Sequence, residues 1–174
     1  TENVITCPES FAIEFTDRHR SIGGDGIVLI ERSEKADAKM RIFNRDGSEG
    51  EMAGNSIRCV GKYLYDNGIV QKENITVETA SGIRSLELFT RNGKVSSVTV
   101  DMGKAYLKPG EIPALLDGEN IIARNAEIGG KEYSMTCVSV GNPHCVIFVD
   151  NVDKVDIEKT GPQIENAEIF PERI

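Results

Sequence analysis

A polar turn followed by a helix, within residues 44–68, carries the residue types best suited to bind a small anion. Asp46-Gly47-Ser48 is typical of a turn, and the apolar residues that follow recur at helical spacing. A helix that starts behind such a turn presents backbone N–H groups that no helical carbonyl accepts, together with the positive end of its dipole. The spacing therefore predicts an anion site where this helix begins.

Asn44 is the polar side chain at the end of the preceding predicted strand. Its amide can both donate and accept hydrogen bonds, which suits the carboxylate and ammonium groups of an amino acid. The alternative is an Asx turn that only shapes the following three residues. Asn55 or Ser56 is the expected N-cap of the helix, and Gly68 is the expected left-handed residue after its end.

A second polar cluster, Gly141-Asn142-Pro143-His144-Cys145, stands where a further strand is predicted to start. Asn-Pro favours a turn, and functional residues are often found at such positions. From the residues alone, the favoured interpretation is structural. In it, His144 is satisfied by a backbone group and Cys145 is a small core residue.

The chain has four cysteines, at positions 7, 59, 137 and 145. None forms a Cys-x-x-Cys pair, so a zinc knuckle is not indicated. A chain of 174 residues does not need disulfides to build a core, and we interpret the cysteines as free thiols in a reducing compartment. Cys59, within the first turns of the central helix, is expected to be buried core filler.

These residues are positioned by alternating strands and helices that predict an α+β architecture. The first half is expected to form one compact unit ending near Gly103, with Asn92-Gly93 as a hairpin turn. Its predicted elements are helices at residues 8–19 and from 53–56 to 68, and strands at 27–30, 38–43, 74–79, 83–90 and 94–101.

A connection bearing proline and glycine at residues 104–120 leads to a second set of predicted strands at 121–128, 131–140 and 144–149. A short helix is predicted within 152–158, stopped by Gly161-Pro162. No strong amphipathic helix is predicted to cover these strands. The second half is therefore expected to be an incomplete domain.

Composition excludes several classes of function. The chain is 39% hydrophobic and 28% charged, as expected of a globular protein. The formal net charge of -8 and the lack of a basic run argue against a nucleic-acid partner. No apolar run could span a membrane, and a signal peptide is absent or was removed before Thr1.

The motif Asn44-x-Asp46-Gly47-Ser48, followed after four residues by x-Gly54-Asn55-x-x-Arg58, resembles the signature of the diaminopimelate epimerase family. Further blocks resemble that family in the same order. They are Asp17-Arg18-His19, Gly24-Asp25-Gly26, Asp101-Met102-Gly103, residues 138–145 and Phe170-Pro171-Glu172-Arg173. Proline racemases and the phenazine-type isomerases are similar in design but carry a histidine where this chain has Asn55.

The resemblance implies two pseudo-symmetric domains, each with a mixed sheet wrapped round a central helix, here residues 1–105 and an incomplete 106–174. It implies an isomerase that interconverts LL- and meso-2,6-diaminopimelate, for lysine and peptidoglycan precursors, by two-base proton transfer at the α-carbon. No cofactor or metal is implied. The expected partner is a small amino-dicarboxylate rather than nucleic acid or membrane, with a cytoplasmic location and a homodimer as the candidate assembly.

The resemblance also assigns roles to residues. Asn44, Gly54, Asn55 and Asn142 would bind substrate, and His144 would assist as a base, which reverses the structural interpretation of Asn142 and His144. The family's first catalytic cysteine falls at position 53, where this chain has Ala53, whose methyl group cannot carry a proton.

The family's opening strand would precede Thr1, and the second catalytic cysteine and central helix would follow Ile174. The chain as given is therefore expected to be inactive. The alternatives are a non-catalytic amino-dicarboxylate-binding homologue or a related amino-acid racemase or epimerase.

Overall fold

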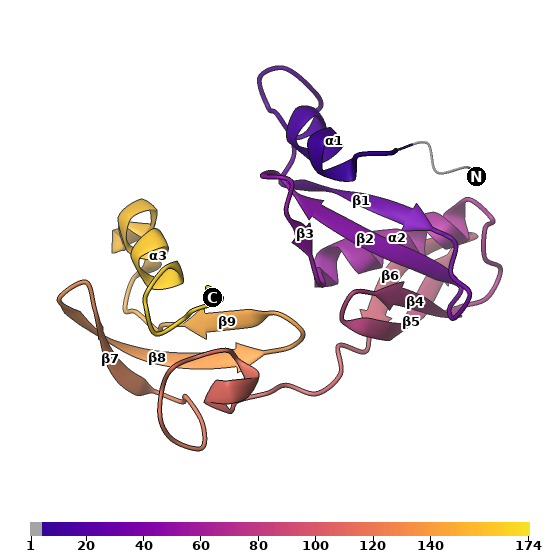
Figure 1. The fold of residues 1–174 in the computed structure, drawn as a ribbon. Coiled ribbons are helices and arrows are strands. Elements are labelled where there is room, and N and C mark those ends of the chain that lie inside the picture. The colour runs from indigo at the N-terminus through magenta and orange to yellow at the C-terminus, as the bar shows by residue number, and fades with distance from the viewer. Residues whose placement is uncertain (1–4) are drawn as a thin grey trace. The chain divides into compact units, whose positions relative to one another are not determined.

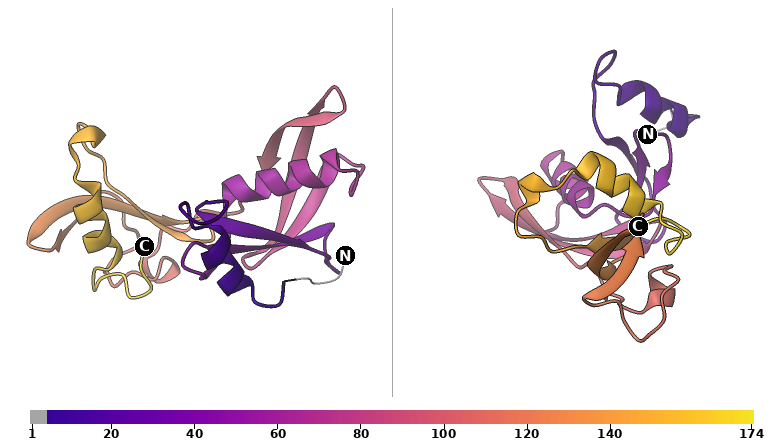
Figure 2. Two further views of the ribbon diagram at one scale, coloured as in Figure 1. Left: turned by 90° about the horizontal axis from the view of Figure 1, so that it is seen from above. Right: turned by 90° about the vertical axis from the view of Figure 1, so that its left-hand side faces the viewer.

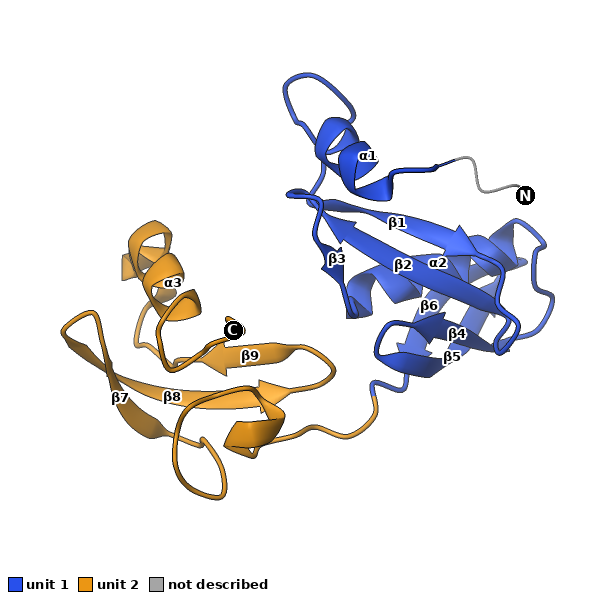
Figure 3. Ribbon diagram, in the orientation of Figure 1, with its two compact units in different colours: residues 1–102 blue, residues 103–174 orange. Residues whose placement is uncertain are grey.

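The structure is a computed structural model that describes residues 5–174 and divides into two compact units. The first unit ends at Met102 and the second begins at Gly103 (Figure 3). Each unit has its own buried apolar cluster. No helix in the described part of the chain is long and apolar enough to cross a membrane.

The first unit is built around a six-stranded mixed sheet (Figure 1). The strand order is β1-β2-β4-β5-β6, with β3 paired to β2. Among the strands that the structure describes in this unit, only β2 and β4 pair in parallel. The elements are α1 (Pro8–Phe15), β1 (Gly26–Glu31), β2 (Ala38–Asn44), β3 (Glu49–Gly50), α2 (Gly54–Asp66), β4 (Asn74–Thr79), β5 (Gly82–Arg91) and β6 (Lys94–Val100).

All five predicted strands of this unit are present, and the first predicted helix ends at Phe15, earlier than expected. The hairpin turn is confirmed. Asn92 and Gly93 have φ values of 54° and 74° and link the paired residues Arg91 and Lys94. Two consecutive positive φ values are those of a type I′ turn, which the Asn-Gly pair accommodates.

Helix α2 packs along the sheet through a narrow apolar stripe (Figure 2). Ile57, Val60, Gly61 and Leu64 are buried, which confirms the helical spacing read from the sequence. A Cβ added at Gly61 would lie 2.9 and 3.0 Å from methyl groups of Leu86 and Leu88 on β5. The glycine therefore lets the helix approach the sheet closely.

The expectation that Cys59 is buried is wrong, because its side chain is exposed. At about 100° per residue, position 59 lies on the face opposite to the buried stripe. The predicted left-handed glycine after the helix end is confirmed. Asn67 caps α2, and Gly68 follows in the left-handed region with φ of 69°.

The second unit holds a three-stranded antiparallel sheet, β7-β8-β9. Its cluster of buried residues includes Ile112, Ile121, Met135 and Phe170. The elements are η1 (Pro109–Glu111), β7 (Arg124–Ile128), β8 (Lys131–Ser139), β9 (Pro143–Val146), η2 (Val152–Lys154) and α3 (Ile157–Glu165). β7 begins later than predicted because Ala123 takes a positive φ of 48°.

Helix α3 corrects the prediction that Gly161-Pro162 ends the only helix of this region. The helix runs through Pro162. Asp156 caps its start by accepting the Lys159 N–H at 3.3 Å. Asn166 closes its end by donating from its side chain to the Pro162 carbonyl at 2.8 Å. Proline removes one hydrogen bond, and capping at both ends together with packing of Ile164 against the cluster offsets that loss.

Candidate functional site

Asn44 lies at the mouth of a tight hairpin between β2 and β3. Its backbone N–H donates to the Ser48 carbonyl at 2.8 Å, and its carbonyl accepts the Gly47 N–H at 2.9 Å. Three residues therefore form the loop, and Gly47 closes it with φ of 85°. A Cβ at Gly47 would also come within 3.1 Å of the Glu9 carbonyl oxygen of α1, so this turn needs glycine.

A chain of hydrogen bonds orients the Asn44 amide. Asn44 Nδ2 donates to Ser48 Oγ at 3.0 Å, and Ser48 Oγ donates to Asp46 Oδ1 at 2.5 Å. The Asx-type contact of the turn belongs to Asp46, whose Oδ1 accepts the Ser48 N–H at 2.9 Å. The Asn44 side chain thus does not make the Asx-type contact of the turn, although its amide donates to Ser48. Its exposed Oδ1 has no hydrogen-bond partner among the described residues.

An ion pair links β2 and β3 beside Asn44. Arg41 donates from Nε and Nη2 to the two carboxylate oxygens of Glu49, at 2.7 and 2.8 Å. The guanidinium also lies 4.8 Å from the centre of the Phe43 ring. The two hydrogen bonds lower the pKa of Glu49 and raise the pKa of Arg41.

Replacing Glu49 with glutamine should therefore make the free energy of unfolding depend less steeply on pH in the acidic range. A depressed pKa in the folded state adds stability above the carboxyl's unfolded pKa, and that stability is lost as the pH falls through the folded value. The Glu49 side chain is 40% exposed, so we expect a cost of about 0.2–1 kcal/mol near pH 7 that shrinks as the pH falls through the folded-state pKa of the carboxyl. Urea unfolding of both proteins from neutral to acidic pH measures this difference in the free energy of unfolding. A difference that does not change with pH would contradict the prediction.

The start of α2 has no polar cap. Ala53 is the N-cap residue, its carbonyl accepts the Ile57 N–H at 3.0 Å, and no side-chain capping bond is made. The prediction of Asn55 or Ser56 as the cap is therefore wrong. The N–H groups of Gly54, Asn55 and Ser56 have no helical carbonyl to accept them. This is the arrangement that an anion can complete.

Asn55 is held by a neighbour one turn along α2. Arg58 Nη2 donates to Asn55 Oδ1, and both side chains are exposed. With the carbonyl oxygen engaged, the Asn55 amide offers its NH₂ group as a donor. Arg58 was part of the sequence motif, but its contact with Asn55 was not predicted. The (i, i+3) spacing of the two residues on a helix was the available signal.

Asn142 and His144 come together at the β8–β9 hairpin of the second unit. His144 Nε2 lies 3.1 Å from Asn142 Oδ1. The partner is thus a side chain, not the backbone group of the structural interpretation. Gly141, with φ of 108°, allows the turn. The hydrogen bond leaves Nδ1 of an exposed imidazole for another group.

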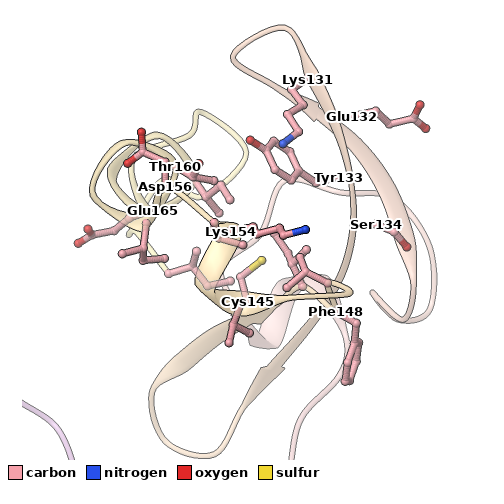
Figure 4. Close-up of a pocket in the computed structure, with 18 residues that line it drawn as sticks. Lys131, Glu132, Tyr133, Ser134, Cys145, Phe148, Lys154, Asp156, Thr160 and Glu165 are labelled. Carbon is pink, nitrogen blue, oxygen red and sulfur yellow. The ribbon is translucent and has the colours of Figure 1, made fainter.

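The predicted site residues therefore fall into two groups, one in each unit. Asn44, Ala53, Gly54 and Asn55 lie at the β2–β3 turn and the start of α2, while Asn142 and His144 share a hairpin. None of the six lines the groove of about 1100 Å³ between the β8–β9 sheet and α3. Figure 4 shows that groove, with Lys131, Tyr133, Cys145 and Lys154 among its lining side chains.

A family model described as diaminopimelate epimerase matches residues 1–108, which include the whole first unit. The chain belongs to the diaminopimelate epimerase family. Curated diaminopimelate epimerases from Acetivibrio thermocellus and Agathobacter rectalis are 52% and 48% identical over 99% of the chain. The chain spans 62% and 63% of the length of these relatives.

Solved structures show the same fold at low sequence identity. A hydroxyproline epimerase from Agrobacterium vitis aligns over 91% of this chain and 42% of its own, with a TM-score of 0.61 and 18% identity. A probable proline racemase from Agrobacterium radiobacter aligns with the same coverage and TM-score at 17% identity. The predicted diaminopimelate-epimerase-like α+β fold is confirmed.

In this diaminopimelate epimerase family member, position 53 has a definite geometry. Ala53 is half-buried, with extended φ and ψ of -139° and 109°, immediately before the helix. Cys59 is six residues further along and about 240° further round an ideal helix. The Cys59 thiol therefore cannot take the place of a side chain at position 53.

Proposed function

We propose that this chain is part of an isomerase of the kind that interconverts LL- and meso-2,6-diaminopimelate by two-base proton transfer at the α-carbon without a cofactor, and that the chain as given is inactive because position 53 is alanine. Membership of the diaminopimelate epimerase family supports this reaction. The observation that carries the binding step is the uncapped start of α2 behind the Asn44 turn. It offers three N–H donors and a helix dipole to the α-carboxylate.

Each site residue has a role in this proposal. Asn44, through its exposed Oδ1, accepts from the substrate ammonium, and the Asn55 NH₂ donates to a carboxylate. Gly54 leaves room for the carboxylate to approach the helix N-terminus, Asn142 orients His144, and His144 assists as a base. The proposal includes a cytoplasmic location and a homodimer.

Inversion requires one group to remove the α-proton from one face while another delivers a proton to the opposite face. Ala53 can do neither, so with alanine at this position the site binds substrate without turning it over. A non-catalytic amino-dicarboxylate-binding protein is the second candidate, and Ala53 is the observation that favours it.

A calorimetric titration of meso- and LL-diaminopimelate into the full-length protein tests binding, with Gly54→Ala as the key variant. A Cβ at Gly54 would lie 3.8 Å from the Met102 side chain, an ordinary contact, and the backbone there is helical. The fold therefore tolerates alanine. We expect unchanged thermal unfolding but binding weaker by about tenfold, because the methyl group obstructs the carboxylate.

Gly110→Ala is the matched control, since a Cβ there meets nothing within 4 Å. It should change neither stability nor affinity. Equal affinity of the Gly54→Ala and Gly110→Ala variants would rule out binding at the start of α2. Binding of proline or hydroxyproline in preference to diaminopimelate would favour a related racemase instead.

A further inference from the structure

Cys137 on β8 and Cys145 on β9 face each other across an antiparallel strand pair. The Cys137 N–H donates to Ile121 O at 2.8 Å, and the Ser139 N–H donates to Tyr106 O at 2.9 Å, so both point away from β9. The two cysteines are therefore a non-hydrogen-bonded pair, for which the Cα atoms lie about 4.5 Å apart. Disulfides span Cα separations of about 4.4–6.8 Å, so the backbone allows a bond here.

The two thiols differ in exposure and acidity. Cys137 is fully buried, whereas Cys145 is half-buried and lines the groove beside α3 (Figure 4). The neighbouring thiol lowers the pKa of Cys145 and raises the pKa of Cys137, which burial raises further. A reagent that enters the groove therefore meets Cys145 first, and Cys137 is its partner on the neighbouring strand.

We propose that Cys145 and Cys137 form a two-thiol redox site, in which a peroxide oxidises Cys145 and Cys137 converts the product into a cross-strand disulfide. The Cys145 thiolate attacks one oxygen of hydrogen peroxide, forming an S–O bond and breaking the O–O bond, and the leaving hydroxide takes up a proton to become water. Cys137 sulfur then attacks the sulfenic sulfur. An S–S bond forms, and the hydroxyl leaves with the Cys137 proton as a second water. The two sulfurs supply the two electrons that reduce the peroxide.

Reversal by a dithiol should be easy. The expected Cα separation lies near the short end of the disulfide range, and strained disulfides are more readily reduced. Cys7 and Cys59 are exposed, and neither lies opposite a cysteine in a described strand pair. Because their exposure alone would let a peroxide oxidise them first, both are replaced in the experiment so that only the β8–β9 pair is measured.

The experiment uses the full chain with Cys7→Ser and Cys59→Ser, treated with hydrogen peroxide, alkylated and mapped by peptide mass spectrometry. We expect free thiols to fall from two to none, a linked peptide pair lighter by two hydrogen atoms, and recovery of both thiols with dithiothreitol. Far-UV circular dichroism before and after treatment checks that the fold persists. In the same background, Cys145→Ser should leave Cys137 as a free thiol, with Cys145→Ala as a second variant if serine impairs folding.

Two outcomes would contradict the proposed redox site. One is over-oxidation of Cys145 to sulfinic acid while Cys137 stays alkylatable, which would show that the buried thiol does not resolve the intermediate. The other is a linked peptide that appears only in urea, which would mean that the folded strands do not permit the bond. Neither result bears on the proposed epimerase function, which does not use these thiols.

Discussion

Ala53→Cys, introduced into a protein with the full length of the curated relatives, should raise the rate of substrate α-proton exchange by about 10²–10⁴-fold. The position is suited to a proton-transferring thiol because it immediately precedes the uncapped N–H groups of α2. The helix dipole favours a thiolate by about 0.3–2 kcal/mol, which lowers the thiol pKa by about 0.2–1.5 units.

Exchange of the α-proton measured by NMR in deuterated water reports this step without requiring a separate product assay. Ala53→Ser is the matched control, since a hydroxyl of similar size is a far weaker base at neutral pH and should restore little exchange. Cys59→Ser in the Ala53→Cys background should change nothing, because Cys59 lies on the exposed face of α2. A folded Ala53→Cys protein that binds substrate but shows no α-proton exchange would contradict the proposed two-base mechanism.

The start of α2 shows where sequence reasoning succeeded and where it failed. The spacing of the apolar residues correctly predicts the helix and its buried face, because packing of the helix against the sheet determines that spacing. The N-cap prediction failed because it relied on side-chain preference alone. Met52 and Ile57, at the positions of a hydrophobic staple around Ala53, are both buried in the core cluster. Tertiary burial therefore fixes the start without a polar cap.

The second unit was predicted less well, for a comparable reason. Gly161-Pro162 carries a strong local signal for a helix end, yet α3 continues because Asp156 and Asn166 cap it and Ile164 packs inward. Long-range packing of this kind has no local signature. The contacts that orient the site, such as Arg58 with Asn55 and Ser48 with Asn44, depend on rotamers that the motif does not encode.

Gly26→Ala should destabilise the first unit by about 1–3 kcal/mol and displace the end of β2 that holds Asn44. Gly26 is paired with Asn44 across β1 and β2. A Cβ at Gly26 would lie 2.4 Å from the Phe43 carbonyl oxygen, a backbone atom that cannot rotate away. The loss exceeds the gain of about 0.4–1 kcal/mol that alanine provides by restricting the unfolded chain.

Gly24→Ala, two residues earlier, is the matched control. Its added Cβ would meet only the Gly26 backbone, with the carbonyl oxygen at 3.6 Å and the nitrogen at 3.9 Å, and both are ordinary contacts. The free energy of unfolding of this variant should therefore stay within about 0.5 kcal/mol of the unsubstituted protein. Denaturant unfolding compares the two variants, and diaminopimelate titration shows whether the shift reaches Asn44. If both variants were equally stable, the backbones of β1 and β2 would not approach as closely as the structure places them. Asn44 would then owe its position to the Ser48–Asp46 turn alone.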